Sequence, residues 1–194
     1  MKLETTPIED LFILHRPVHQ DKRGQFTRLF AAEGLASAGR PTEAVHVNTS
    51  TSVEAGTLRG IHFQFPPYAE AKIVACTAGA IWDVGVDLRP DSPTRFQWFG
   101  KKLTPENGFS MIIPEGFGHA FLTLEPNSTA VYVVSAIYAI EHESGVCYDD
   151  PALAIDWPMV PTVVSEKDLS WGPISKRIPE LDSGFAVNKR RHGK

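Results

Sequence analysis

Between residues 26 and 139 the chain repeats one pattern, in which short runs rich in Val, Ile, Phe and Trp alternate with Gly, Pro, Asn and Asp. Turn residues at such close spacing are typical of strands joined by tight turns, and they leave little room for long helices. No helical pattern recurs between the runs, which disfavours a parallel sheet with crossing helices. The sequence therefore predicts an antiparallel all-β domain.

The predicted strands have similar lengths and cover residues 26–30, 44–50, 58–64, 71–79, 80–88, 97–103, 110–114, 119–125 and 129–139. Two short helices are expected, one near residues 33–39 and one that starts at Ser165. Strands of this kind protect their edges best in a jelly roll or a related barrel, whose interior offers a ligand cavity. We expect one domain, residues 1–194, with its core at about 21–168, and functional side chains that face inward.

Composition and charge exclude several classes of protein. A net charge of −4 argues against nucleic-acid binding, and no apolar run is long enough to cross a bilayer. Acidic residues near the amino terminus occupy the place of the basic segment of a secretory signal, which predicts a cytoplasmic protein. Cys76 and Cys147 each lack a nearby second thiol, so neither a disulfide framework nor a zinc site is expected.

The run AIWDVGVDL, residues 80–88, alternates strictly between apolar side chains and Asp83, Gly85 and Asp87. In a strand this alternation sends the two sets to opposite faces. We therefore expect one face of this strand to be either solvated or functional.

Two segments resemble the paired signatures of the cupin jelly roll: GTLRGIHFQFPPYAEAKIVACTAG, residues 56–79, and PEGFGHAF, residues 114–121. In metal-binding cupins such segments supply His, His, Glu and His as ligands. Here the second ligand position holds Gln64, a weak ligand for a transition metal. Lys72, two residues after Glu70, would compete with a cation. The sequence predicts a cupin without metal or other cofactor, in which a protein cation takes the place of the ion.

This set of residues suits proton removal next to a ketone. Such a reaction needs a base, and it needs a cation or hydrogen-bond donor to hold the enolate oxygen. His62 suits the first role because a histidine titrates close to neutral pH, and Lys72 suits the second. Tyr132 is the nearest aromatic hydroxyl with an inward direction, which makes it the candidate acid for the opposite face.

A longer series of motifs resembles the dTDP-4-dehydrorhamnose 3,5-epimerase family. In chain order they are DKRGQF, NTS, GTLRGIHFQFPP, EAKIV, WDVGVDLRPDSPT, IPEGFGHAF, EHESGVCYDDPALAIDWP and SEKD, between about Asp21 and Asp168. The resemblance implies a nucleotide-linked 4-keto-6-deoxy sugar as substrate, with inversion at C3 and C5. It also implies a homodimer with exchanged strands, so that part of each site comes from the neighbouring subunit.

The same resemblance assigns roles to individual residues. It implies that His62 is the base, paired with Asp168, and that Tyr132 is the acid. The expected substrate contacts are Lys72 and His119 near the ketone, Arg23 and Arg59 at the diphosphate, Phe26 and Tyr138 at the nucleotide base, and Asn48 of the NTS motif. The chain departs from the family's commonest pattern near the expected nucleotide site, at Arg28, His46 and Ile137.

Several of these residues have plainer alternatives. Lys72 could form an ion pair with Glu70, and Gln64 could bond a neighbouring backbone group. Asp168 could serve a helix cap, since Ser165 begins an S-x-x-D pattern. His62 and His119 could each be structural histidines that satisfy buried groups, and Tyr132 could be core packing.

Arg59 raises a separate question of direction. It lies three positions before His62, and a regular strand would send the two side chains to opposite faces. A bulge at Gly60 would bring both inward.

Three functions therefore compete. The leading one is a cofactor-independent epimerase that acts on a dTDP-linked 4-keto sugar. The second is a metal-dependent cupin oxygenase or isomerase that uses His62, Glu70 and His119. The third is a cupin that binds a sugar nucleotide without catalysis.

Overall fold

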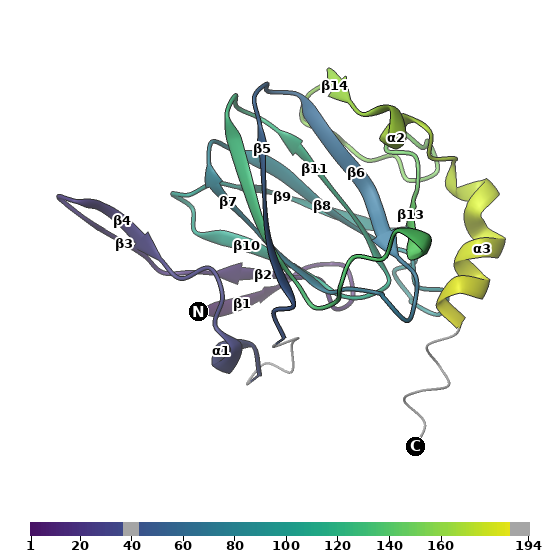
Figure 1. Ribbon diagram of the computed structural model, residues 1–194, viewed down its shortest axis with the longest axis horizontal. Helices are drawn as coiled ribbons and strands as arrows, with labels where there is room; N and C mark the ends of the chain where they lie inside the picture. Colours follow the sequence, from purple (N-terminus) through teal and green to yellow (C-terminus); the bar gives the residue numbers. More distant parts are fainter. Residues whose placement is uncertain (37–42, 187–194) are drawn as a thin grey trace.

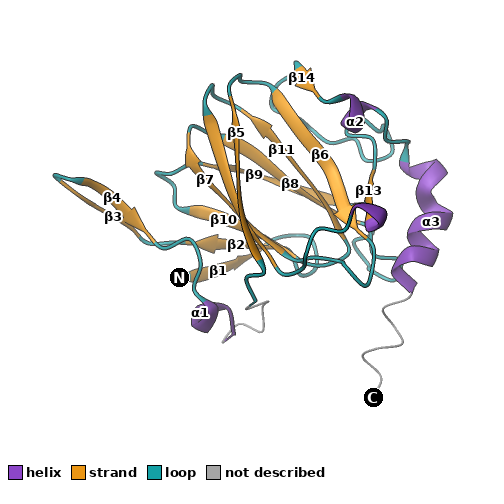
Figure 2. Ribbon diagram, in the orientation of Figure 1, coloured by secondary structure: helices purple, strands orange, loops and turns teal. Residues whose placement is uncertain are grey.

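The computed structural model describes residues 1–36 and 43–186 and contains two facing sheets and a separate hairpin, with helices only at the periphery (Figures 1 and 2). The first sheet has the order β1 (Lys2–Thr5), β2 (Phe12–His15), β10 (Phe109–Ile113), β7 (Lys72–Ala78), β12 (Ser128–Val134) and β5 (His46–Ser52). The second has the order β13 (Glu143–Gly145), β6 (Thr57–Gln64), β11 (Phe117–Thr123), β8 (Ile81–Asp87) and β9 (Trp98–Leu103). Neighbouring strands along both orders are antiparallel, as predicted.

The remaining elements lie around these sheets. A short strand, β14 (Val163–Val164), pairs in parallel with β6, and the hairpin of β3 (Val18–Asp21) and β4 (Gly24–Thr27) projects away from the body (Figure 1). The helices are α1 (Ala32–Ala36), α2 (Glu166–Leu169) and α3 (Ile174–Ala186), with a 3-10 turn at Ile140–His142. Within residues 1–36 and 43–186 no helix is long and apolar enough to span a bilayer.

The space between the sheets is filled at one end by apolar side chains. The first core cluster takes residues from both sheets: Ile13, Val74 and Met111 from the first, Ile81, Leu103, Phe117 and Phe121 from the second. Their burial removes apolar surface from water and fixes the separation of the sheets. The other end of the lumen is left for polar side chains.

The outer face of the second sheet is also buried, by helix α3 together with Val146 and Leu153 of the segment before it. Ile61 and Phe63 of β6 and Val84 and Val86 of β8 belong to a second cluster, which they share with helix residues Ile174, Leu181 and Phe185. Neither face of residues 80–88 is solvated, which leaves the functional alternative for the inner face. Asp83 and Asp87 lie on the inner face, and both are fully buried.

The strand at residues 129–139 is shorter than predicted. β12 ends at Val134, and residues 135–139 form a loop. The strand at 26–30 likewise ends at Thr27, and β1, β2, β3, β13 and β14 were not predicted, since each is four residues or shorter. The predicted helix at 33–39 is present as α1, although its residues 37–39 lie outside the described part of the chain.

Helix α3 was missed because its sequence carries breaking residues. Pro179 and Gly184 lie inside it, and both residue types disfavour a helix interior. The apolar contacts of its buried face outweigh this local preference.

A bulge at Gly60 sets the direction of the site residues. Arg59 pairs with Phe121 and His62 pairs with His119, so β6 uses three residues where β11 uses two. Gly60 has φ +124°, and a Cβ there would lie 2.6 Å from the His119 carbonyl oxygen, which leaves glycine as the residue that fits. The predicted bulge is confirmed, and it lets Arg59 and His62 face the same side.

Candidate active site

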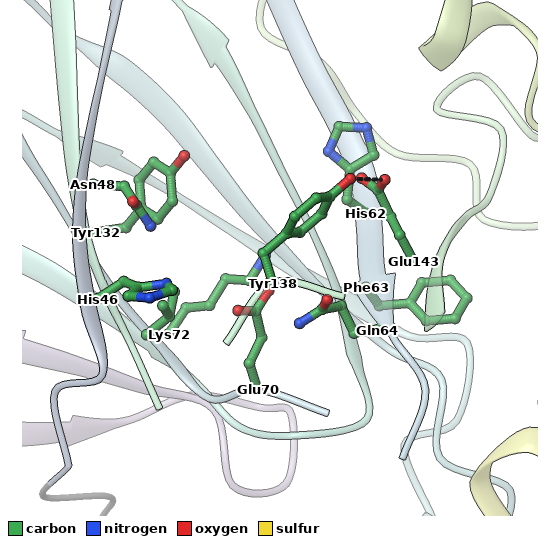
Figure 3. A pocket seen from close by; sticks show the side chains of 11 residues that line it. His46, Asn48, His62, Phe63, Gln64, Glu70, Lys72, Tyr132, Tyr138 and Glu143 are labelled. Atoms are coloured by element: carbon green, nitrogen blue, oxygen red, sulfur yellow. Dashed lines mark hydrogen bonds and ion pairs between the residues drawn. The ribbon is translucent and has the colours of Figure 1, made fainter. Parts of the chain in front are cut away.

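A cavity of about 380 Å³ opens between the two sheets at the polar end of the lumen (Figure 3). Its walls come from both sheets and from the loop after β12. The lining residues are His46, Asn48, His62, Phe63, Gln64, Glu70, Lys72, Tyr132, Val134, Tyr138 and Glu143. The structure thus brings together five of the predicted site residues: Asn48, His62, Lys72, Tyr132 and Tyr138.

His62 is held by a buried carboxylate. Its Nε2 lies 2.6 Å from Asp168 Oδ1, and the Gly60 N–H donates to Asp168 Oδ2 at 3.3 Å. Asp168 does not cap its own helix, because Ser165 Oγ is the acceptor and the Asp168 N–H is the donor, at 3.1 Å. The capping pattern and the His62 pairing therefore coexist, and the pairing leaves the other ring nitrogen, Nδ1, for a ligand.

The charge of Asp168 is stabilised by these partners. Burial acts to raise the pKa of this carboxyl, but hydrogen bonds from His62 and Gly60 outweigh it and hold the pKa below its usual value. A carboxyl whose pKa is lower in the folded protein stabilises the fold above its unfolded pKa, about 4. That contribution is lost as the pH falls through the folded pKa.

We therefore expect wild-type protein to lose more stability than Asp168→Asn as the pH falls from about 5 to about 3. Urea midpoints at pH 5, 4 and 3 measure the difference in slope. Asp156→Asn, at an exposed carboxyl, is the control and should keep the wild-type slope. Parallel curves for wild type and Asp168→Asn would contradict the role given to the pair.

Lys72 and Glu70 form the ion pair that the sequence left open. Lys72 Nζ lies 3.1 Å from Glu70 Oε1, and both side chains are largely buried. Both also line the cavity, so the pair points an ammonium group at whatever occupies it (Figure 3). An ammonium group that is held by a carboxylate and lines the cavity suits an oxyanion partner.

Tyr132 projects from the first sheet, so it faces the cavity from the wall opposite His62 of β6 (Figure 3). Burial raises the pKa of its phenol, and the negative charge of Glu70 raises it further. The positive charge of Arg59 acts to lower the pKa, but the net effect is an increase. Arg59 itself is exposed and is not among the residues that line the cavity. A phenol that stays protonated is able to donate a proton.

His119 lies directly opposite His62 in the register of β11 and β6, so both side chains leave the same face of the sheet. His119 is buried, does not line the cavity, and has its Nε2 2.7 Å from Asp83 Oδ1. The sequence did not predict Asp83 as the partner of His119. The feature that could have indicated it was the position of Asp83 on the polar face of residues 80–88.

Tyr138 lies across the front of the cavity (Figure 3). Its hydroxyl donates to Glu143 Oε2 at 2.6 Å, and this bond raises the pKa of Tyr138 to about 12. Lys167, the neighbour of Asp168, donates to the same carboxylate oxygen at 2.6 Å. Glu143 and Lys167 were also missed, although both lie inside the quoted motifs EHES and SEKD.

Arg23 and Phe26 are not part of this cavity within one chain. Both lie on the projecting β3–β4 hairpin (Figure 1). Phe26 is 66% exposed, and the Arg23 guanidinium binds Asp21 at 2.6 Å. A single chain therefore does not bring these two predicted residues to the other site residues.

The metal-dependent alternative needs His62, Glu70 and His119 as common ligands. Each of them is bound to another group: His62 to Asp168, Glu70 to Lys72 and His119 to Asp83. In the described part of the chain no three His, Cys, Asp or Glu side chains are arranged to hold an ion. The residues present do not fit a metal site.

A carboxylate-bound imidazole, an ammonium and a phenol around one cavity are groups that move a proton and hold an oxyanion. A barrel equipped in this way suits an isomerase. Comparison with known proteins narrows this class.

The family model of dTDP-4-dehydrorhamnose 3,5-epimerase matches residues 5–176. A dTDP-4-dehydrorhamnose 3,5-epimerase from Sinorhizobium fredii is 39% identical over 171 residues, which is 88% of each chain. The chain thus belongs to the dTDP-4-dehydrorhamnose 3,5-epimerase family and is an isomerase, as the resemblance implied.

Solved structures agree with this placement and confirm the cupin-type jelly roll. A 3,5-epimerase from Legionella pneumophila, in complex with dTDP-4-keto-L-rhamnose, has a TM-score of 0.87 at 36% identity and covers 93% of this chain and 96% of its own. A 3'-monoepimerase from Streptomyces bikiniensis, in complex with dTDP-quinovose, has a TM-score of 0.85 at 32% identity, with 90% and 89% covered. The similar proteins therefore include one that is named a 3,5-epimerase, for two positions of the sugar, and one that is named a 3'-monoepimerase, for a single position.

Proposed function

We propose that this protein epimerises C3, C5 or both in a dTDP-linked 4-keto-6-deoxyhexose, as a step of deoxysugar biosynthesis. The observation that carries the proposal is the cavity in which His62, backed by Asp168, faces Tyr132 and Lys72 of the other sheet. Family membership and the ligands named for similar structures support the substrate class.

The reaction begins with proton transfer to His62. Its Nε2–H donates to Asp168, so the lone pair on Nδ1 takes a proton from the carbon next to the ketone. The C–H electron pair forms the C=C bond of an enolate, and the carbonyl pair moves to oxygen. Lys72 stabilises that oxyanion.

Inversion follows when a proton arrives on the other face. The Tyr132 hydroxyl gives its proton to the same carbon as the carbonyl re-forms, and the carbon then has the opposite configuration. The two residues come from opposite sheets, which supports delivery from opposite faces of a sugar held between them.

Incubation with dTDP-4-keto-6-deoxyglucose in heavy water tests the function. Deuterium at both C3 and C5 supports 3,5-epimerisation, and deuterium at one position supports a monoepimerase. Without deuterium at either position the proposal fails for this substrate. A protein that binds the compound yet exchanges no proton would be the non-catalytic alternative.

The projecting hairpin supports a dimer that completes the site. Arg23 and Phe26 have no place in their own cavity, and β5, at the edge of the first sheet, exposes 65% of Val47 beside the lining residues His46 and Asn48. An edge strand is able to accept a strand from another chain, and we propose that the hairpin of a second copy lies there. Sedimentation should show a dimer at micromolar concentration; a monomer would contradict this arrangement.

A further inference from the structure

The loop at residues 135–139 carries Tyr138 across the cavity, but its large apolar side chains are mostly not buried. Ile137 and Tyr138 are at least half exposed, and Ile140, at the start of the 3-10 turn, is 67% exposed. A surface loop of this kind holds one conformation only where polar contacts fix it.

Gln64 supplies such contacts on both sides of Tyr138. Its Nε2 donates to the Ile137 carbonyl at 3.2 Å, and its Oε1 accepts from the Ala139 N–H at 2.6 Å. The same Nε2 donates to the Tyr68 carbonyl at 3.0 Å, which ties the loop after β6 to the loop after β12. The amide is 3% exposed, so these bonds are shielded from water.

A second anchor holds the ring itself. The Tyr138 hydroxyl is bound to Glu143, which Lys167 also binds. Burial acts to raise the pKa of Glu143, but Lys167 and Tyr138 outweigh it, and the carboxyl stays ionised. Backbone and side chain of Tyr138 are therefore both fixed before any ligand arrives.

We infer that Gln64 is a positioning residue for nucleotide binding, which acts by holding Tyr138 in place. The inference rests on the proposed function, in which Tyr138 meets the nucleotide base. Only an amide donates to one carbonyl and accepts from an N–H at the same time in this geometry. Gln64 occupies a position that holds a metal ligand in metal-binding cupins. In this chain it orders a binding loop, which reduces the loss of conformational entropy when the ligand binds.

Gln64→Met tests the inference, since it removes the hydrogen bonds and nearly keeps the volume. Calorimetry with dTDP should show binding weaker by roughly 10-fold, the loss expected when a side chain must be ordered on binding. The turnover number at saturation should stay within about 2-fold, because the reacting groups are untouched. Asn107→Leu is the matched control: Asn107 also makes three bonds to backbone, outside the cavity, and its loss should leave dTDP affinity unchanged.

A double variant separates positioning from general damage. In a Tyr138→Ala background, Gln64→Met should change dTDP affinity by less than about 2-fold, since the residue it positions is gone. An equal loss in both backgrounds, or the same loss in Asn107→Leu, would overturn the inference.

Hydrogen exchange supplies a readout that needs neither ligand nor turnover. The Ala139 amide of the free wild-type protein should be protected although it lies in a loop, and Gln64→Met should expose it. Free exchange in the wild type would overturn the inference even if Gln64→Met does not fold. If wild type fails to bind dTDP, the proposed function is wrong, while Ala139 exchange still decides whether Gln64 orders the loop.

Discussion

His62→Ala is expected to abolish deuterium incorporation at C3 and C5, with a loss of at least about 10³-fold in turnover. Positioned general-base catalysis contributes about 10²- to 10⁴-fold, and no second base is held by a carboxylate among the residues that line the cavity. The assay is proton exchange in heavy water, followed by NMR of the sugar.

The control uses another histidine that binds a carboxylate. His15 binds Glu4 outside the cavity, so His15→Ala removes an equivalent pair and should leave exchange intact. Added imidazole should restore part of the activity of His62→Ala. Exchange at the wild-type rate in His62→Ala would contradict the assignment of His62 as the base.

Tyr132→Phe is expected to separate proton removal from inversion. His62 can still form the enolate and return a solvent-derived deuteron to the same face, so substrate should become labelled. Formation of the inverted product should fall by about 10²- to 10⁴-fold, the usual contribution of a positioned acid. The ring is retained, and with it the packing of Tyr132 against the first core cluster.

Separate measurement of labelled substrate and inverted product checks this expectation. Tyr148→Phe is the control, because Tyr148 packs against the second core cluster and does not line the cavity. If Tyr132→Phe inverted its substrate at the wild-type rate, another group would have to be the acid.

Strand periodicity predicted the bulge at Gly60, because Arg59 and His62 are three positions apart and a regular strand would send them to opposite faces. Asn48 and Tyr138 were named only through the family resemblance, and Tyr138 lies on a loop, where strand periodicity gives no direction. The pairing of His62 with Asp168 came from the family resemblance, since more than a hundred residues separate the two in the chain.

The residues that were missed depend on contacts between distant segments. Asp83 is a partner only because β8 lies beside β11, which brings its carboxylate to His119. Glu143 gains its role from the segment that places Lys167 next to it. No local sequence pattern predicts such contacts between distant segments, which become visible only in the folded structure.

Helix α3 has a consequence for the strand that carries the base. Ile61 and Phe63, which flank His62, share the cluster that the helix seals, and α3 lies almost wholly beyond residue 176, where the family match ends. A chain cut at residue 173 would retain every side chain that lines the cavity, yet Ile61 and Phe63 would lose the helix residues of their cluster, Ile174, Leu181 and Phe185. Helix α3 thus supports the strand of His62 from outside the barrel, although it supplies no side chain to the cavity.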